Sequence, residues 1–231
     1  MLFRSHHFYK LTPQERIKRV QDFTKLKSEE LESLQKTGRL NLEQANQMIE
    51  NVIGTIELPV GLGVHFLING KEYIVPMALE EPSVIAAASK MAKVSKLRGG
   101  IQTSSTDPVM IGQIQITNVK DPFGAKLRLL SQKEKLLKMA NEFDPMLVKV
   151  GGGAVGFEVR VIDTPQEFMV VCHLLVNCKD AMGANAINTM VEGLADEVSK
   201  IAQGRVYLRI LSNLAVHRLA RAYAEFDKNK L

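Results

Sequence analysis

Two adjacent carboxylates, Glu80 and Glu81, stand where an apolar segment gives way to a helix-forming one. The apolar segment Tyr73–Leu79 predicts a β-strand, and the small residues Ala86–Ser89 lie in the middle of the predicted helix. Proline suits the first position of a helix because its missing N–H has no partner there, so we expect the helix to begin at Pro82. Paired acids at such a point are candidates for general acid–base chemistry. Acids also occur at many ordinary helix starts, and the pair alone does not separate these interpretations.

A second motif, DAMGAN, follows the long apolar segment Phe168–Val176 and opens another predicted helix. Its residues are Asp180, Ala181, Met182, Gly183, Ala184 and Asn185. The small residues leave the backbone accessible, and a helix N-terminus presents unpaired N–H groups, which together suit a pyrophosphate. The pattern is not the G-x-G-x-x-G of a Rossmann fold. The structural alternative is that Asp180 caps the helix and the small residues allow tight packing.

Both motifs, with a third, resemble those of class II, soluble hydroxymethylglutaryl-CoA reductases. The similarity rests on EEPSVIAAAS (Glu80–Ser89), ENVIG (Glu50–Gly54) and DAMGAN (Asp180–Asn185), in the order of that family and at about its spacing. ILSN (Ile210–Asn213) supports it, and the similarity extends from about Phe8 to the last residues. Three motifs in register are a specific signal, whereas each motif alone is weak.

The resemblance implies an oxidoreductase of the mevalonate and isoprenoid pathway. In that family the thioester of hydroxymethylglutaryl-CoA is reduced twice by hydride from a nicotinamide cofactor, which yields mevalonate and coenzyme A. Glu81 matches the proton donor, and Ser83 matches a contact to the hydroxymethylglutaryl group. Asn213 lies in a segment that matches one near the active site.

The resemblance also implies a cofactor site and a dimer interface. Asp144 matches an acid that contacts the adenosine ribose, where a carboxylate binds the 2′-hydroxyl of NAD and repels the 2′-phosphate of NADP. We therefore expect NAD(H) to be favoured over NADP(H), although Asp144-Pro145 is also an ordinary turn sequence. The ENVIG residues, which the family places at its dimer contact, are Glu50, Asn51, Val52, Ile53 and Gly54.

The resemblance covers only the N-terminal part of the family. A lysine, an aspartate and a histidine that complete the family's catalytic site lie beyond the positions present here. We therefore expect this chain to be incomplete as a catalyst, and to form a homodimer or larger oligomer or to pair with a second polypeptide carrying the C-terminal half. The alternative is a non-catalytic relative that binds dinucleotide or pairs with another subunit.

The net charge of +5 favours an anionic partner, which could be a phosphorylated cofactor or a nucleic acid. The second half of the chain predicts a β-α-β-β-α-β order, and RNA binding on a sheet of this kind requires aromatic residues on the central strands. The apolar segment Phe168–Val176 offers only Phe168, at its start. We therefore expect no nucleic-acid partner.

The remaining composition indicates a globular cytoplasmic protein. Cys172 and Cys178 lie on one predicted strand, and six residues of strand span roughly 20 Å, so no disulfide can join them. Free thiols point to a reducing compartment. No zinc-type spacing of cysteines and histidines occurs, and no apolar segment approaches the ~20 residues that span a bilayer. We expect no metal site and no membrane association.

The first part of the chain is predicted to contain short helices and a hairpin. Thr12-Pro13-Gln14-Glu15 is a capping box that opens one helix. Ser28 starts a second helix and Asn41 caps a third, while Pro59–Gly63 is expected to interrupt regular structure. Asn69-Gly70 predicts a type I′ turn between two strands.

The second part predicts a β-α-β-β-α-β order, the ferredoxin-like split βαβ unit. One helix, opened by Asp121-Pro122, is expected between the first two strands. The fold class is therefore α+β. We assign residues 1–106 to part of a large substrate-binding and dimerisation domain, 107–212 to a small NAD(P)-binding domain, and 213–231 to a segment returning to the large domain.

Overall fold

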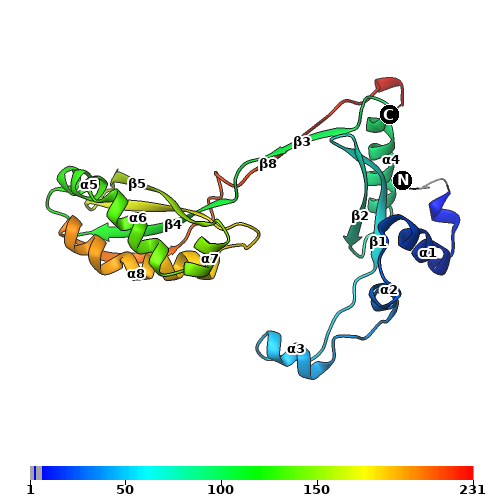
Figure 1. The fold of residues 1–231 in the computed structure, drawn as a ribbon, viewed down its shortest axis with the longest axis horizontal. Coiled ribbons are helices and arrows are strands. Elements are labelled where there is room, and N and C mark those ends of the chain that lie inside the picture. The colour runs from blue at the N-terminus through cyan, green and yellow to red at the C-terminus, as the bar shows by residue number, and fades with distance from the viewer. Residues whose placement is uncertain (1–2, 4–6, 231) are drawn as a thin grey trace. The chain divides into compact units, whose positions relative to one another are not determined.

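The computed structural model describes residue 3 and residues 7–230, apart from the side chain of Leu34. The chain divides into two compact units (Figure 1). Unit 1 contains residues 1–103 and 222–231, and unit 2 contains residues 104–221. Unit 2 is thus inserted into the sequence of unit 1.

Unit 1 combines helices with a four-stranded sheet of order β2-β1-β3-β8. Its elements are η1 (Phe8–Lys10), α1 (Pro13–Thr24), α2 (Ser28–Gln35), α3 (Leu42–Met48), β1 (Val60–Ile68), β2 (Lys71–Ala78), α4 (Val84–Lys96), β3 (Ile101–Ser105), β8 (Ala220–Ala224) and η2 (Lys228–Lys230). Strands β1 and β2 are antiparallel, and β3 lies parallel to β1.

Local sequence signals set much of unit 1. The predicted capping box is confirmed, because the Thr12 side chain accepts the Glu15 N–H while the Glu15 side chain accepts the Thr12 N–H. Asn69 and Gly70 both have positive φ, 48° and 78°, which confirms the turn between β1 and β2.

Helix α4 packs on β1, and the small residues of the helix allow the close approach. The Ser89 hydroxyl accepts the Val64 N–H at 3.1 Å, and a β-carbon on Gly61 would clash with Ile85. The Val64 side chain belongs to a small core that it forms with the buried side chains of Phe3, Phe8 and Val20. Strand β1 therefore connects α4 to the N-terminal helices.

Unit 2 has a four-stranded antiparallel sheet of order β5-β6-β4-β7. Its elements are β4 (Val109–Thr117), α5 (Pro122–Ser131), α6 (Lys133–Glu142), α7 (Pro145–Lys149), β5 (Gly153–Asp163), β6 (Phe168–Asn177), α8 (Ala184–Ala202) and β7 (Arg205–Leu211). The first and third strands occupy the centre, which is the predicted ferredoxin-like arrangement.

Helices α5, α6 and α8 cover one face of this sheet (Figure 1). Helix α8 has 19 residues, and some of its apolar side chains form a completely buried stripe. These side chains recur at the spacing expected for one face of a helix. This stripe consists of Ile187, Met190, Val191, Leu194 and Val198. It packs with the inward side chains of the strands, which include Ile114, Ile116, Val170, Leu174 and Val176. Unit 2 therefore has the larger core of the two units.

Several predicted boundaries are wrong. Helix α4 begins at Val84, because Pro82 and Ser83 form a turn and Ser83 has a φ of 69°. The single helix expected after Asp121 is divided at Gln132 into α5 and α6. Strand β1 already begins at Val60, within the segment Pro59–Gly63 that was expected to interrupt it.

Among the described residues, no helix has both the length and the apolar character needed to cross a membrane. Cys172 and Cys178 are both buried and unbonded to one another, as predicted from their spacing.

Candidate functional site

The predicted acid pair lies in the connection between β2 and α4. Glu80, Glu81 and Ser83 are all exposed to solvent. The Ser83 carbonyl accepts the Ala87 N–H at 2.8 Å to start α4, but the Ser83 side chain makes no capping hydrogen bond. The hydroxyl is therefore available to a ligand beside the two carboxylates.

The acid pair lines a small hollow of about 320 Å³. Its other walls come from the start of β1, the end of β2 and the start of α4. The lining residues are Pro59, Val60, Gly61, Leu79, Glu80, Glu81, Pro82, Ser83 and Ile85. A proton donor there would face a partly apolar space.

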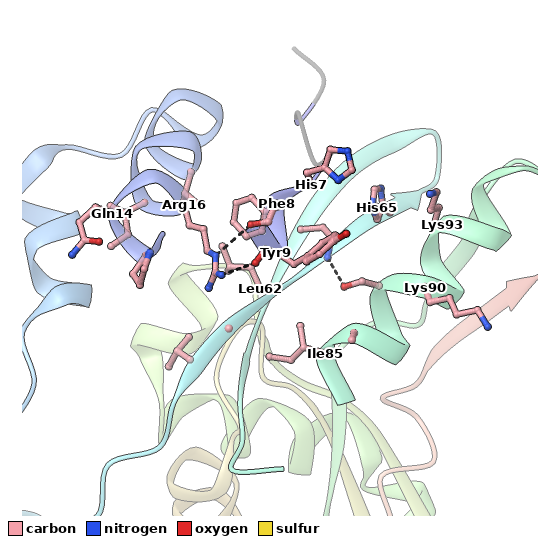
Figure 2. Close-up of a pocket in the computed structure, with 18 of the residues that line it drawn as sticks. His7, Phe8, Tyr9, Gln14, Arg16, Leu62, His65, Ile85, Lys90 and Lys93 are labelled. Carbon is pink, nitrogen blue, oxygen red and sulfur yellow. Dashed lines mark hydrogen bonds between the residues drawn. The ribbon is translucent and has the colours of Figure 1, made fainter. Parts of the chain in front are cut away.

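A larger hollow of about 1440 Å³ lies between the N-terminal helices, β1 and α4, and we call it the basic hollow (Figure 2). Its nitrogen-bearing side chains include those of Arg16 on α1, His65 on β1, and Lys90 and Lys93 on α4 (Figure 2). No aspartate or glutamate is present among the described residues that line it. Its electrostatic character therefore favours an anion.

The two hollows adjoin one another at Ser83. Val60, Gly61, Ser83 and Ile85 line both of them. A ligand with an anionic part in the basic hollow can therefore extend past Ser83 toward Glu81. This arrangement brings together the two residues of unit 1 that were predicted to act on substrate.

His65 occupies an irregularity in β1. Its φ is 70°, unusual for a residue with a side chain, and the pairing with β2 shifts register between Gly63 and Phe66. Such bulges re-aim side chains, and this one coincides with the wall of the basic hollow. Burial lowers the pKa of His65, and the nearby charges of Lys93 and Lys96 lower it further, so the imidazole is neutral at pH 7.

In unit 2, DAMGAN forms a turn followed by the first residues of α8. Asp180 is exposed and lies three residues before Gly183, which is the N-cap of α8, so the alternative role of Asp180 as the cap is wrong. Gly183 has a φ of 100° and no side chain with which to cap the helix. The first N–H groups of α8 therefore have no side-chain cap, which suits an anion.

The rest of the motif surrounds this helix start. Ala181 and Met182 are exposed in the turn, Ala184 is half-buried as the first residue of α8, and Asn185 is exposed. The Ala181 N–H donates to the Cys178 carbonyl at 3.1 Å, which closes the turn. The motif thus presents a short, largely exposed stretch of backbone.

Asp144 is the N-cap of α7, and its Oδ1 accepts the Leu147 N–H at 2.9 Å. Gly152 is packed between α7 and the end of β6. A β-carbon added at Gly152 would lie 2.6 Å from both Leu147 Cδ1 and the Asn177 carbonyl oxygen. The segment bearing Asp144 and the strand leading into DAMGAN therefore meet at Gly152.

The remaining predicted site residues are Asn213 and the ENVIG segment, residues 50–54. Asn213 is exposed in the segment after β7, where its carbonyl accepts the Ala215 N–H at 3.0 Å. Residues 50–54 follow α3 outside any helix or strand. Glu50, Asn51 and Gly54 are exposed, Val52 is half-buried, and Ile53 is 98% exposed.

Sequence reasoning missed the basic hollow and Arg218, whose guanidinium donates to two backbone carbonyls of the DAMGAN turn. Lys90 and Lys93 are three residues apart on one helix face, a spacing that could have indicated a shared surface. Arg218 and Ala181 are 37 residues apart in the sequence. A contact between such distant segments is not revealed by any local sequence pattern.

Known proteins resemble this chain along nearly all of its length. The family model described as hydroxymethylglutaryl-coenzyme A reductase matches residues 12–231. The 3-hydroxy-3-methylglutaryl-coenzyme A reductase of Archaeoglobus fulgidus is 53% identical over 222 residues, which cover 96% of this chain and 51% of that protein. The probable reductase of Borreliella burgdorferi is 30% identical over 167 residues, covering 72% of this chain and 37% of that protein.

A solved structure is also similar. The class II reductase from Streptococcus pneumoniae, bound to NADPH in open conformations, matches with a TM-score of 0.91 and 36% identity over all of this chain and 62% of that chain. The chain spans about half the length of the first curated relative it matches. With a family match extending from residue 12 to residue 231, the chain belongs to the hydroxymethylglutaryl-coenzyme A reductase family.

Proposed function

We propose that this chain forms part of an enzyme that interconverts hydroxymethylglutaryl-CoA and mevalonate plus coenzyme A, with NAD(P)H as the reductant. The observation that carries the proposal is the junction at Ser83 between the basic hollow and the hollow lined by Glu81. Coenzyme A carries several phosphates, and its acyl group is attached at the far end of a long arm. The phosphates suit the basic hollow, and the arm can deliver the acyl group to Glu81.

In this proposal the residues of unit 1 bind the thioester and supply a proton. Ser83 hydrogen-bonds the hydroxymethylglutaryl group, and Glu81 donates a proton to the oxygen that gains negative charge during reduction. We also propose that Asn213, which lies in unit 2 in the segment after β7, is a substrate-binding residue. A bound nicotinamide supplies the hydride for each of the two reductions.

The residues of unit 2 hold the dinucleotide. The start of α8, within Asp180–Asn185, receives the pyrophosphate, and a β-carbon at Gly183 would fill the space against Cys178. Asp144 Oδ2 accepts the 2′-hydroxyl of the adenosine ribose, since Oδ1 already accepts the Leu147 N–H. The negative charge opposes a 2′-phosphate, so we propose NADH in preference to NADPH, although the S. pneumoniae relative was solved with NADPH.

We further propose that residues 50–54 form a dimer interface, and that the enzyme acts in the cytoplasm. The support for the interface is the apolar surface around this segment, where Ile53 and Ile56 are 98% and 92% exposed. Isolated exposed apolar residues are common, but two almost fully exposed isoleucines within one extended segment are typical of an interaction site. The domain roles follow: unit 1 binds the thioester and pairs with another subunit, and unit 2 binds the cofactor.

The test of the reaction is its stoichiometry. In a full-length reductase containing this chain, hydroxymethylglutaryl-CoA should drive oxidation of two NADH for each coenzyme A thiol released. A single NADH per thiol would indicate an aldehyde product, and binding of dinucleotide without any substrate-dependent oxidation would favour the non-catalytic alternative.

The test of the basic hollow is a titration of the 231-residue chain with coenzyme A and with pantetheine, which lacks the phosphates. Lys93→Gln should weaken coenzyme A binding up to about fivefold, the range of one partly exposed charge, and leave pantetheine unchanged. Lys138→Gln, on the exposed face of α6 in unit 2, is the control. Equal effects of the two substitutions would remove the basic hollow from the proposal.

A further inference from the structure

Thr106, near the start of unit 2, forms hydrogen bonds with the segment that follows β7. The Thr106 hydroxyl donates to the His217 carbonyl at 2.7 Å and accepts the Leu219 N–H at 2.8 Å. The Thr106 N–H donates to the Leu219 carbonyl at 3.0 Å. The residues immediately before and after Arg218 are therefore both fixed, which leaves little freedom in the position of its α-carbon.

From this fixed backbone, Arg218 extends its guanidinium to the DAMGAN turn. One terminal nitrogen, Nη1, donates to the Ala181 carbonyl at 2.7 Å, and the other, Nη2, donates to the Lys179 carbonyl at 3.3 Å. A planar guanidinium can address two carbonyls at once because its donors diverge at fixed angles, and an ammonium lacks this geometry. Hydrogen bonds from a charged donor are also stronger than neutral ones.

The turn needs such support because its backbone is unusual. Lys179 has a φ of 52° and Gly183 a φ of 100°, so the turn begins and ends in the left-handed region. The Lys179 N–H is also held, by the Asn177 side-chain oxygen at 3.1 Å, and the Cys178 N–H donates to the Pro108 carbonyl at 3.0 Å. Carbonyl oxygens repel an anion, so their engagement by a cation favours an anion at the neighbouring helix start.

We propose that Arg218 is a positioning residue for the dinucleotide pyrophosphate. It holds the Lys179 and Ala181 carbonyls in one arrangement, and this arrangement sets the backbone that leads to Gly183 and the N–H groups at the start of α8. The inference rests on the proposed dinucleotide site. It adds a residue that lies outside DAMGAN and acts through that motif's backbone.

The experiment compares the Arg218→Lys variant with the unmodified 231-residue chain. The lysine keeps the positive charge but lacks the two diverging N–H donors of the guanidinium. NADH and NADPH titrations should show both ligands weakened about tenfold, the loss expected when one charge-assisted hydrogen bond is removed. The NADH-to-NADPH preference should not change, because Asp144 sets it. Hydrogen exchange should accelerate at the amides of residues 179–184 and remain unchanged in the core of α8.

Arg221→Lys is the matched control, since it makes the same charge-conserving exchange at an exposed position three residues away. It should leave affinity and exchange close to those of the unmodified chain. If Arg218→Lys binds NADH with unchanged affinity, Arg218 has no positioning role. If the unmodified chain binds neither dinucleotide, the proposed cofactor site itself is wrong, and the titration separates that outcome from failure of Arg218 alone.

Discussion

Gly183 lies directly against Cys178. A β-carbon on Gly183 would be 3.0 Å from the Cys178 β-carbon and closer still to its sulfur, and the φ of 100° is one that side-chain-bearing residues rarely adopt. Cys178 is buried, so it cannot move aside into solvent. The start of α8 therefore depends on a glycine at this position for two separate reasons.

We expect Gly183→Ala to lower the free energy of unfolding by about 2–5 kcal/mol, as the sum of left-handed strain and overpacking. Gly151→Ala, with a φ of 81° but only ordinary contacts with Lys179, should cost about 1–2 kcal/mol. Urea unfolding of both variants measures the difference. Equal losses would show that the contact with Cys178 contributes nothing.

Substitution of Asp144 separates its capping role from its charge. Asp144→Asn retains a good N-cap and removes the negative charge, so it should preserve stability and abolish the preference for NADH over NADPH. Asp144→Ala should lose the preference and also about 0.5–2 kcal/mol of stability, because the Leu147 N–H loses its acceptor. Cofactor titration and thermal unfolding check both. An unmodified chain that binds the two cofactors equally would contradict the proposed role.

Glu81→Gln should reduce turnover by roughly 10²–10⁴ in a full-length reductase containing this chain, the usual effect of removing a general acid. Stability should change little because the side chain is exposed. Glu80→Gln is the neighbouring control, and it should retain most of the activity. Comparable losses in the two variants would assign the effect to the local charge rather than to Glu81.

Ile53→Asp should shift the chain toward monomers and should leave the fold of the single subunit intact, because the side chain makes almost no contacts within its own subunit. Leu127→Asp, at a 69% exposed position on α5, introduces the same charge elsewhere and should leave the oligomeric state unchanged. Sedimentation velocity at several concentrations distinguishes the two. A monomeric unmodified chain would be evidence against an interface at residues 50–54.

Burial raises the pKa of the Cys172 thiol from its ordinary value of 9.0 to about 12. The folded protein therefore keeps the thiol protonated where the unfolded chain loses the proton, so this contribution to stability is complete below pH 9 and declines as the pH rises from 9 toward 12. The decline should be about 1.4 kcal/mol per pH unit within that window.

Urea unfolding between pH 8 and about 10.5 measures this slope, and Cys172→Ala should show a shallower one. The comparison uses slopes because the cavity left by alanine lowers stability at every pH. Burial also raises the pKa of Cys178, so a residual slope of the same sign should remain in the variant. Identical slopes in the two proteins would argue against ionisation of Cys172 as the cause.

Local chemistry made some elements predictable. The Asn69-Gly70 turn and the Thr12 capping box are specified by their own residue types, and the apolar periodicity of unit 2 predicted its β-α-β-β-α-β order along the chain. Strands β3 and β8 were not predicted because their sequences, IQTSS and ARAYA, are short, mostly exposed and lack a stripe of large apolar residues. Pairing with distant segments defines those strands.

The candidate site shows the same contrast between features set by local sequence and features set by distant contacts. DAMGAN was identified from its small residues, but Arg218 and the basic hollow depend on contacts between distant segments. The division of the expected helix at Gln132 was also hidden, since Leu129, Leu136 and Ala140 remain buried on a continuous stripe across it. A pattern of buried residues reports which face is covered, and it does not report whether the backbone is continuous.

The hydrogen bonds between Thr106 and Leu219 also affect the order in which the chain can fold. They bring the first and last parts of unit 2 together, so a folded unit 2 presents its two ends side by side. For unit 1, the long insertion then behaves as a short closed loop, and the entropy cost of bringing β3 and β8 into one sheet is largely removed. The inserted unit thereby assists assembly of the sheet that it interrupts.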